Sequence, residues 1–364
     1  MSQLLKTKLH IPKPRPDLVP RPHLIEHLNI GAQRKLVLIS APPGFGKTTL
    51  LSEWIQSRKM PAAWLSLDPG DNDPARFFAY LIAALQTVNA DVGESVSTML
   101  HLPQLPPLES LLPPLLNDLA NLSQDVIIVL DDYHTIENET IHNAIAFLLE
   151  HLPAQIHIVI ATRADPPLPL SRLRARNQLV ELRAQDLTWN AGEAAAFLNR
   201  TMELKLSRDD VAALTVRTEG WIAGLQMAAL SLKARTDTTE FIRAFTGSHR
   251  FVLDYLAEEI LNRQSPATQD FLRQTAILDR MSASLCDAVT QRADSQAVLH
   301  RLEQANLFVI PLDDERRWYR YHRLFADLLH QHLLESQPEI VPALHRRASA
   351  WYEQNAQFTE AIEH

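Results

Sequence analysis

Residues 35–51, K-L-V-L-I-S-A-P-P-G-F-G-K-T-T-L-L, join a continuous apolar run to a helical pattern through a loop with two glycines. The chain has only nine glycines in 364 residues, so Gly44 and Gly46 mark a place where the backbone needs their conformational freedom. A strand, a tight loop and a helix in this order point backbone N–H groups inward around an anion. The segment therefore predicts a strand–loop–helix unit that holds phosphate groups.

Residues 41–48 fit the pattern G-x-x-x-x-G-K-[ST] except at its first position, where Ala41 replaces glycine. Alanine is tolerated there if its φ is negative. Lys47 supplies a cation for the outer phosphates of a nucleotide, and Thr48 supplies a hydroxyl for Mg²⁺. The alternative is a chance Gly-x-Gly turn, which the flanking strand and helix disfavour. We therefore expect ATP or ADP to bind at this phosphate loop with Mg²⁺.

A second apolar run, V-I-I-V-L-D-D at residues 126–132, ends in two carboxylates. In sheets of parallel strands, ligands bind in the crevice beyond the carboxyl ends of the strands. Asp131 would then hold Mg²⁺ through water, and Asp132 would orient or deprotonate an attacking water. The alternative is a strand that ends in two solvated acids.

Two further runs bear on the reaction. The run at residues 157–163 ends in Ala-Thr-Arg, so Arg163 would face the same crevice and sense a γ-phosphate, or else pair with a surface acid. The run at residues 62–67 is expected between the lysine-loop strand and the aspartate strand, as in ATPases with an extra strand there. That arrangement favours hydrolysis or switching over phosphate transfer to a small molecule. Asp73, before Pro74, is expected either to cap a helix or to take part in the reaction.

Five β-branched or apolar runs alternate with helical stretches up to residue 183, which predicts an α/β fold with a parallel five-stranded sheet. The apolar spacing of residues 209–234 is helical. Helices followed by a hairpin then predict a winged helix, and a final helical pair predicts the start of a superhelical repeat array. The expected divisions are an N-terminal arm (1–34), a nucleotide-binding domain (35–185), a helical domain (186–249), a winged-helix domain (250–335) and a repeat region (336–364).

Composition bears on the cellular compartment and on the partners expected for the chain. A single cysteine, Cys286, excludes an intramolecular disulfide and a cysteine-rich metal site, which fits a reducing cytosol. Pro12, Pro14 and Pro16 interrupt the N-terminal segment where a signal peptide needs an apolar core, and no apolar run approaches membrane-spanning length. The net charge of −8 gives no overall attraction to nucleic acid or anionic lipid. We expect a cytoplasmic protein with no membrane partner.

Local motifs spread over nearly the whole chain occur in an order known from one family. They are L-L-K-T-K-L-H-I-P, V-P-R-P-H-L, S-A-P-P-G-F-G-K-T-T-L, W-L-S-L-D-P-G-D-N-D-P-A-R-F, L-D-D-Y-H, A-T-R, T-E-G-W-I-A-G-L-Q-M-A-A-L and Y-R-Y-H-R-L-F-A-D-L-L. Together they resemble the signal-transducing P-loop ATPases of the NACHT/NB-ARC-like (STAND) class. The resemblance is strongest to the large ATP-binding LuxR-family transcription regulators related to the maltose-regulon activator.

This resemblance implies a regulatory switch. ADP would hold the nucleotide, helical and winged-helix domains closed, inducer plus ATP would open them for self-association, and slow ATP hydrolysis would restore the closed state. The unidentified inducer would bind a C-terminal sensor region missing from this sequence, and DNA would be bound only through a missing C-terminal domain. Arg21 would lie near the adenine, and His322 would touch the β-phosphate of ADP.

The residues expected at the site fall into three overlapping groups. The nucleotide-binding group is Arg21, Pro43, Gly44, Phe45, Gly46, Lys47, Thr48, Thr49 and His322; the catalytic group is Asp131, Asp132 and Arg163; the metal group is Thr48 and Asp131.

Two other functional classes stay open. One is a steady-turnover ATPase that performs mechanical work, which would need an arginine finger or a transporter signature. The other is a winged helix that binds nucleic acid through basic residues interleaved with acids. The basic residues are Arg292, His300, Arg301, Arg316 and Arg317, and the acids are Asp294, Glu303, Asp313, Asp314 and Glu315.

Overall fold

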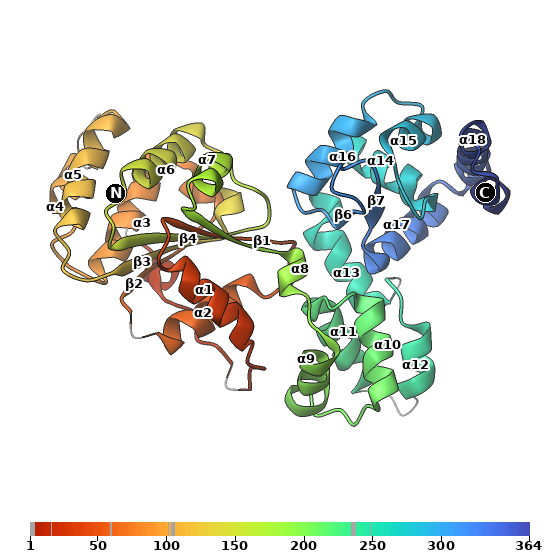
Figure 1. Ribbon diagram of the computed structural model, residues 1–364, viewed down its shortest axis with the longest axis horizontal. Coiled ribbons are helices and arrows are strands. Elements are labelled where there is room, and N and C mark those ends of the chain that lie inside the picture. The colour runs from red at the N-terminus through yellow and green to blue at the C-terminus, as the bar shows by residue number, and fades with distance from the viewer. Residues whose placement is uncertain are drawn as a thin grey trace. The chain divides into compact units, whose positions relative to one another are not determined.

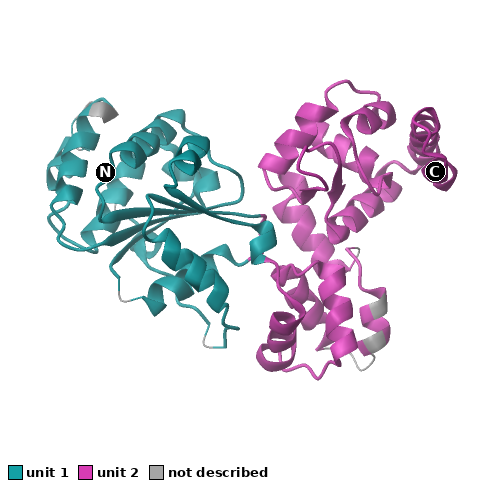
Figure 2. Ribbon diagram, viewed as in Figure 1, with its two compact units in different colours: residues 1–41, 46–187 teal, residues 42–45, 188–364 magenta. Residues whose placement is uncertain are grey.

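The computed structural model describes residues 4–15, 17–58, 60–100, 102, 106–233, 238–247 and 249–364. Contacts within the chain separate two compact units (Figure 2). The first unit is Met1–Ala41 with Gly46–Leu187, and the second is Pro42–Phe45 with Thr188–His364. The tip of the phosphate loop thus belongs by its contacts to the second unit.

The first unit is built on a sheet of five parallel strands, which confirms the predicted α/β class. The strands are β1 (Leu36–Ser40), β2 (Ala62–Ser66), β3 (Val126–Asp131), β4 (Ile156–Thr162) and β5 (Leu179–Arg183). Their order across the sheet is β2-β3-β4-β1-β5, and every neighbouring pair is parallel. All residues of β1, β3 and β4 are buried, which explains why these strands are apolar at successive positions.

The strand between β1 and β3 is β4, not β2. Residues 62–67 were predicted at that position, but β2 lies at the edge of the sheet beside β3 instead. The sheet does contain an extra strand between β1 and β3, but the prediction that residues 62–67 form it was wrong. The order of strands along the chain does not fix their order across a sheet. The pairing of Leu36 with Ile158 and of Leu130 with Ile160 sets the register on the two sides of β4.

Helices cover both faces of this sheet (Figure 1). Helices α1 and α2 lie on one face, whereas α3, α5 and α6 share a continuous apolar core with the other face. The helices of this unit are α1 (Pro22–Gly31), α2 (Lys47–Ser57), α3 (Pro74–Gln86), α4 (Glu94–Leu100), α5 (Leu108–Ala120), α6 (Glu139–His151), α7 (Leu170–Ala175) and α8 (Ala184–Leu187). Short 3-10 turns are η1 (Lys6–Leu9), η2 (Pro69–Asn72) and η3 (Tyr133–Thr135).

The second unit is helical apart from one hairpin. Strands β6 (Val309–Pro311) and β7 (Tyr319–Tyr321) pair antiparallel after three short helices, as a winged helix requires. The predicted helical segment 209–234 forms α10 (Arg208–Thr218) and α11 (Ile222–Leu232), and its last residue lies outside the described ones. The closing pair α18 (Val341–Gln354) and α19 (Phe358–Glu363) forms as predicted.

The remaining elements of the second unit connect these parts. They are α9 (Ala191–Ala196), η4 (Phe197–Thr201), α12 (Thr238–Ala244), α13 (Arg250–Glu259), η5 (Leu261–Arg263), α14 (Pro266–Gln274), η6 (Thr275–Ile277), α15 (Ala283–Thr290), α16 (Ser295–Gln304), α17 (Arg323–Ser336) and η7 (Pro338–Ile340). Among the described residues, none of the helices combines the length and the apolar character needed to span a bilayer.

A buried ion pair fastens the N-terminal arm to the first unit. Lys8, in η1, is 6% exposed and pairs with Asp71, which is fully buried, and with Asp68 at 3.0 Å. Arg76 Nε also reaches Asp71 Oδ1 at 3.1 Å, and the Lys8 ammonium lies 4.4 Å from the centre of the Tyr80 ring. The buried carboxylate therefore has two cationic partners, one of them from the arm.

Replacing Lys8 by methionine should destabilise the first unit by about 3 kcal/mol, because removing one partner of a buried pair leaves a buried charge under-compensated. Arg76 still faces Asp71, which keeps the loss near the low end of the usual range. Pulse proteolysis in urea, scored on fragments of residues 1–187, measures the change. Lys6→Met is the matched control, because Lys6 is exposed; an equal effect of both substitutions would contradict the expectation.

Candidate functional site

The phosphate loop has the backbone that the motif predicts. Gly44 and Gly46 have φ of 77° and 79°, in the left-handed region that favours glycine. Ala41 does not have a positive φ. Its N–H donates to the Thr162 carbonyl at 3.3 Å, which continues the pairing of β1 with β4. Alanine at the first position of the motif therefore costs the loop nothing in backbone strain.

Within the second unit, the loop tip packs closely against the start of α11. The Trp221 indole N–H donates to the Pro43 carbonyl at 3.1 Å, and the Ala223 N–H donates to the Gly44 carbonyl at 3.2 Å. A Cβ on Gly44 would lie 2.6 Å from the Ala223 Cβ. Gly44 is thus required by close approach as well as by its φ. Phe45 is buried, with its ring 6.1 Å from that of Phe308.

Lys47 opens α2 and folds back over the loop. Its Nζ donates to the Ala41 carbonyl at 2.7 Å, and the side chain is buried. Burial, together with the nearby charge of Arg163, lowers the pKa of Lys47 to about 8. The ammonium therefore lies in a poorly solvated place where the oxygens of a phosphate group would stabilise its charge.

Thr48 and Asp131 bring together two oxygen ligands of the kind that Mg²⁺ prefers. The Thr48 hydroxyl donates to the Asp131 carboxylate at 2.9 and 3.1 Å. Burial, together with the charge of Asp132, raises the pKa of Asp131 to about 6. A divalent cation would stabilise the ionised carboxylate, and one hydroxyl plus one carboxylate is a usual protein contribution to Mg²⁺ bound with phosphates. These residues fit the expected metal.

Asp132 follows β3 in a left-handed conformation, with φ of 57°, which is uncommon for a residue with a side chain. Its carboxylate is 46% exposed, and His134 Nδ1 lies 3.7 Å from its Oδ1. The Thr135 N–H and hydroxyl both donate to the Asp132 carbonyl, at 3.0 and 2.9 Å. Asp132 is therefore fixed through its backbone, while its carboxylate reaches solvent.

The structure brings Arg163 to the same edge of the sheet, directly after β4, where its charge acts on Lys47. Thr49 is exposed on the first turn of α2. Arg21 lies elsewhere in the unit: its guanidinium donates to the Leu187 carbonyl at 2.9 Å, and its charge acts on Glu53 of α2. Within the described residues, no group of three or more His, Cys, Asp or Glu side chains could hold a further metal ion.

His322 lies in the second unit, where it is 3% exposed. Its Nε2 is 3.1 Å from the Thr218 carbonyl, and its ring packs edge-on against Phe308 and Trp221. Burial lowers the pKa of His322, and so favours the neutral ring. Nδ1 is buried with no hydrogen-bond partner among the described residues. Trp221 and Phe308, which flank this ring, also contact the loop residues Pro43 and Phe45 within this unit.

Comparison with known proteins agrees with this arrangement. Residues 257–341 match the family model described as the MalT winged helix domain. Over 99% of its length, the chain is 33% identical to the HTH-type transcriptional regulator MalT of Vibrio campbellii and 35% identical to that of Klebsiella pneumoniae. The chain is thus similar to MalT over nearly its whole length. It joins a P-loop ATPase fold to a domain that matches the MalT winged helix.

One further relative and one solved structure extend the comparison. It is 33% identical over 98% of its length to the serine/threonine-protein kinase PknK of Mycobacterium tuberculosis. The chain spans 40% of the length of the MalT regulators and 32% of that kinase. The Walker-type ATPase PABY2304 of Pyrococcus abyssi has a similar fold, with a TM-score of 0.60 and 17% identity over 87% of this chain and 98% of that one.

Sequence reasoning missed several residues that shape the site of the MalT-like chain. Asp73 caps α3 as predicted, accepting a hydrogen bond from the Arg76 N–H at 2.8 Å. Its neighbour Asn72 was passed over, although it binds the segment after Asp132. No sequence pattern predicts the contact of Trp221 with Pro43. The available signal for Asn72 was the run D-P-G-D-N-D, which places four polar side chains soon after a strand.

Replacing Asp131 by asparagine should raise the free energy of unfolding at pH 7 by about 1 to 3 kcal/mol without nucleotide. The folded pKa, about 6, lies above the ordinary 3.8, so the native state binds the extra proton. Stability of the parent therefore falls as pH rises from about 4 to about 6, and the variant lacks this loss. Urea unfolding at pH 4.5 and pH 7 measures it; a difference independent of pH would contradict the assignment.

Proposed function

We propose that this chain is the nucleotide-binding switch module of a MalT-like transcription regulator, which binds ATP or ADP with Mg²⁺ and hydrolyses ATP slowly. The observation that carries the proposal is the cluster of Lys47, Thr48, Asp131 and Asp132 at one edge of the sheet, beside a loop with two left-handed glycines. A buried ammonium and a buried carboxylate next to this loop are what a phosphate–metal pair would neutralise.

Each residue has a role in this proposal. The loop N–H groups and Lys47 bind the phosphates, and Thr48 and Asp131 hold Mg²⁺, which neutralises phosphate charge when bound. Asp132, with its exposed carboxylate, orients the attacking water. Arg163 contacts the γ-phosphate, which distinguishes ATP from ADP. Arg21 and Thr49 complete the nucleotide site by resemblance to the family.

The switch part of the proposal draws on two further observations. Relatives named as a regulator and as a kinase share this segment, which suits a module that controls different outputs. In addition, His322 keeps a buried, unpartnered Nδ1 two ring contacts away from the phosphate-loop tip within the second unit. We propose that the phosphate charge of ADP favours the doubly protonated ring in a closed state, with Nε2–H donating to the Thr218 carbonyl and Nδ1–H donating to the β-phosphate. Release of this contact with ATP and inducer would then permit self-association in the cytoplasm.

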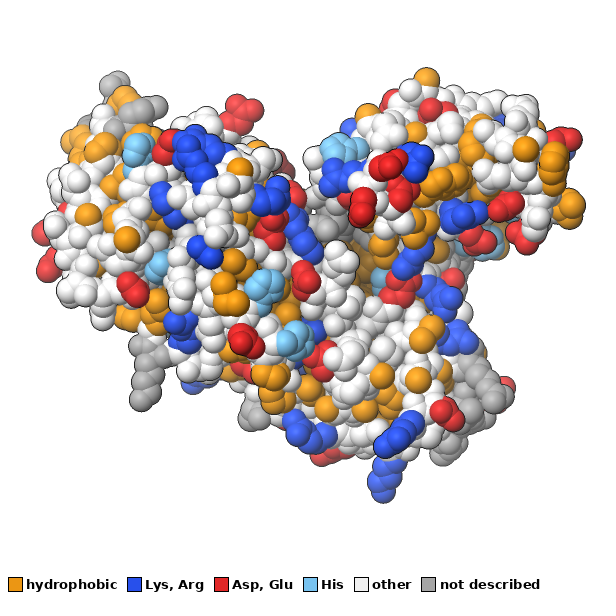
Figure 3. Space-filling model, viewed as in Figure 1, with side chains coloured by type: hydrophobic (Ala, Val, Ile, Leu, Met, Phe, Trp, Pro, Cys, Tyr) orange, Lys and Arg blue, Asp and Glu red, His pale blue; other side chains and the backbone are white. Residues whose placement is uncertain are grey.

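Binding of nucleic acid by this chain has less support. Arg292 makes a two-pronged ion pair with Asp294 at 2.7 and 2.8 Å, so its guanidinium is already engaged. Arg316 pairs with Glu303 at 3.0 Å. Figure 3 shows acidic and basic side chains interspersed over the face in view, without a basic stripe on it. We therefore assign DNA binding to a domain beyond this sequence, as the family resemblance implies.

Lys47→Ala should abolish nucleotide binding, because it removes the cation on the outer phosphates. Purified parent protein should also release ADP or ATP into the supernatant on denaturation, whereas the variant should release none. Chromatography of the supernatant and titration with a fluorescent ATP analogue measure both quantities. Lys35→Ala is the matched control, since Lys35 lies at the opposite end of β1. Nucleotide-free parent protein that also fails to bind ATP would refute the proposed function.

His322→Ala should speed ADP release about tenfold, the effect of losing one hydrogen bond to a charged group. Stopped-flow displacement of a fluorescent ADP analogue gives the rate. His345→Ala, a partly buried histidine elsewhere in the same unit, should leave the rate unchanged. Equal release from His322→Ala and the parent would return His322 to a purely structural role.

A further inference from the structure

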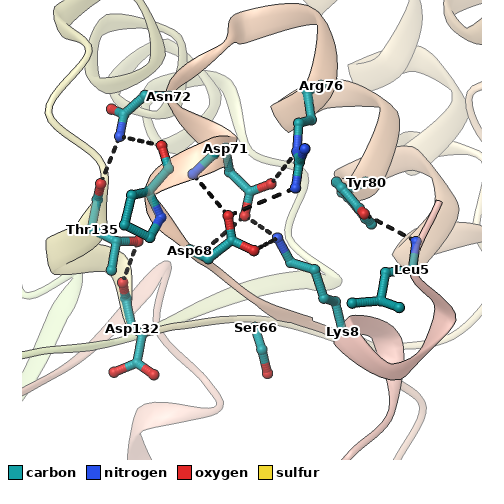
Figure 4. A network of polar contacts seen from close by, with 12 residues as sticks. Leu5, Lys8, Ser66, Asp68, Asp71, Asn72, Arg76, Tyr80, Asp132 and Thr135 are labelled. Atoms are coloured by element: carbon teal, nitrogen blue, oxygen red, sulfur yellow. Dashed lines mark hydrogen bonds and ion pairs between the residues drawn. The ribbon is translucent and has the colours of Figure 1, made fainter. Parts of the chain in front are cut away.

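We infer that Asn72 is a positioning residue for Asp132: it fixes the turn that holds this carboxylate and is itself anchored to the N-terminal arm. The inference rests on the proposed function, in which Asp132 orients the attacking water. Asn72 does not touch the nucleotide site directly, and nothing in the comparisons gives it a role. A set of hydrogen bonds within the first unit joins Asn72 to the Asp132 turn (Figure 4).

Asn72 binds the backbone directly after the Asp132 turn with both ends of its amide. Its Oδ1 accepts from the Glu137 N–H at 2.6 Å and from the Asn138 N–H at 3.0 Å. Its Nδ2 donates to the Thr135 carbonyl at 2.7 Å. The Asn138 side chain returns a bond to the Asn72 carbonyl at 3.0 Å. One side chain thus fixes three backbone groups more than 60 positions away in the chain.

Thr135 carries this constraint to Asp132. Its N–H and its hydroxyl both donate to the Asp132 carbonyl, so the two residues move together. In Figure 4, Asn72, Thr135 and Asp132 form a continuous column from η2 to the end of β3. Asp132 is left-handed, with φ of 57°, and such a conformation persists only where surrounding contacts over-determine it. The bonds from Asn72 are among those contacts.

Asn72 is the last residue of η2, and the segment Asp68–Asp73 around it is fixed by contacts with the N-terminal arm and with α3. The Asp68 side chain accepts from the Gly70 N–H at 2.8 Å, and Asp71 Oδ2 accepts from the Asp68 N–H at 2.9 Å, so the turn closes on itself. Lys8 of the arm pairs with the Asp68 carboxylate, and Arg76 of α3 pairs with the Asp71 carboxylate. Asp68 and Asp71 anchor the segment, and Asp71 is fully buried and satisfied on both oxygens.

The result is a path from the N-terminal arm, through Asn72, to the carboxylate that faces the reacting water. A displacement of about 1 Å in a positioned catalytic group is enough to lower a rate constant by orders of magnitude. Loss of Asn72 should therefore act on the hydrolysis step and spare nucleotide affinity, since none of its partners lies in the phosphate loop.

The test uses the full chain and single-turnover hydrolysis of radiolabelled ATP, with affinity measured by a fluorescent ATP analogue. Asn72→Ala should lower the hydrolysis rate constant at least tenfold and change Kd less than twofold. Asn72→Asp keeps the acceptor for the two amides and loses the donor to Thr135. Its hydrolysis rate constant should therefore lie between those of the parent and of Asn72→Ala. Asp73→Ala is the matched control: it removes the cap of α3 one residue away and should keep the parental rate.

A double substitution separates positioning from general loss of stability. In an Asp132→Glu background the carboxylate is already displaced, so adding Asn72→Ala should cost less than threefold. Losses that multiply in the double variant would overturn the inference, as would a parental rate in Asn72→Ala. If Asn72→Ala fails to fold, Asn72→Asp decides by the same criteria. Failure of the proposed function has a different signature, namely no ATP hydrolysis by the parent, and it overturns both.

Discussion

The parallel pairing of β1, β3 and β4 is the constraint on which the site depends. Because the three strands run in one direction and in matched register, their carboxyl ends meet at one edge of the sheet. The phosphate loop follows β1, Asp131 ends β3 with Asp132 directly after it, and Arg163 follows β4, so the register alone brings them together. The buried, apolar strands supply the hydrophobic energy that keeps this register, and the loops beyond them need to contribute only chemistry.

Burial at this edge shapes the electrostatics of the site. It lowers the pKa of Lys47 and raises that of Asp131, so each group is moved toward its neutral form. A bound metal–phosphate group would reverse both shifts, since it brings negative charge to the lysine and positive charge to the carboxylate. A ligand that brings both charges would therefore relieve unfavourable free energy at these two groups, which agrees with the nucleotide retention proposed above.

Much of the fold and part of the site were predictable from local pattern. Buried strands read as apolar runs, Gly44 and Gly46 reveal a loop that needs left-handed backbone, and Asp73 before a proline predicts a helix cap. The order of the strands was not predictable in this way, and residues 62–67 were assigned the place that β4 occupies. Asn72 escaped notice for the same reason: its partners Thr135, Glu137 and Asn138 become neighbours only when β2 lies beside β3.

The sequence by itself determined the chemistry available, namely which residues end each strand and which loop can wrap a phosphate. Those features are encoded within a few residues by periodicity, glycine placement and capping. Only the tertiary structure decided which strand lies at the centre, that Lys8 of the arm is buried against Asp71, and that Asn72 fixes the turn at Asp132. These contacts join residues about 60 positions apart, and the packing of the whole sheet, rather than any local preference, selects them.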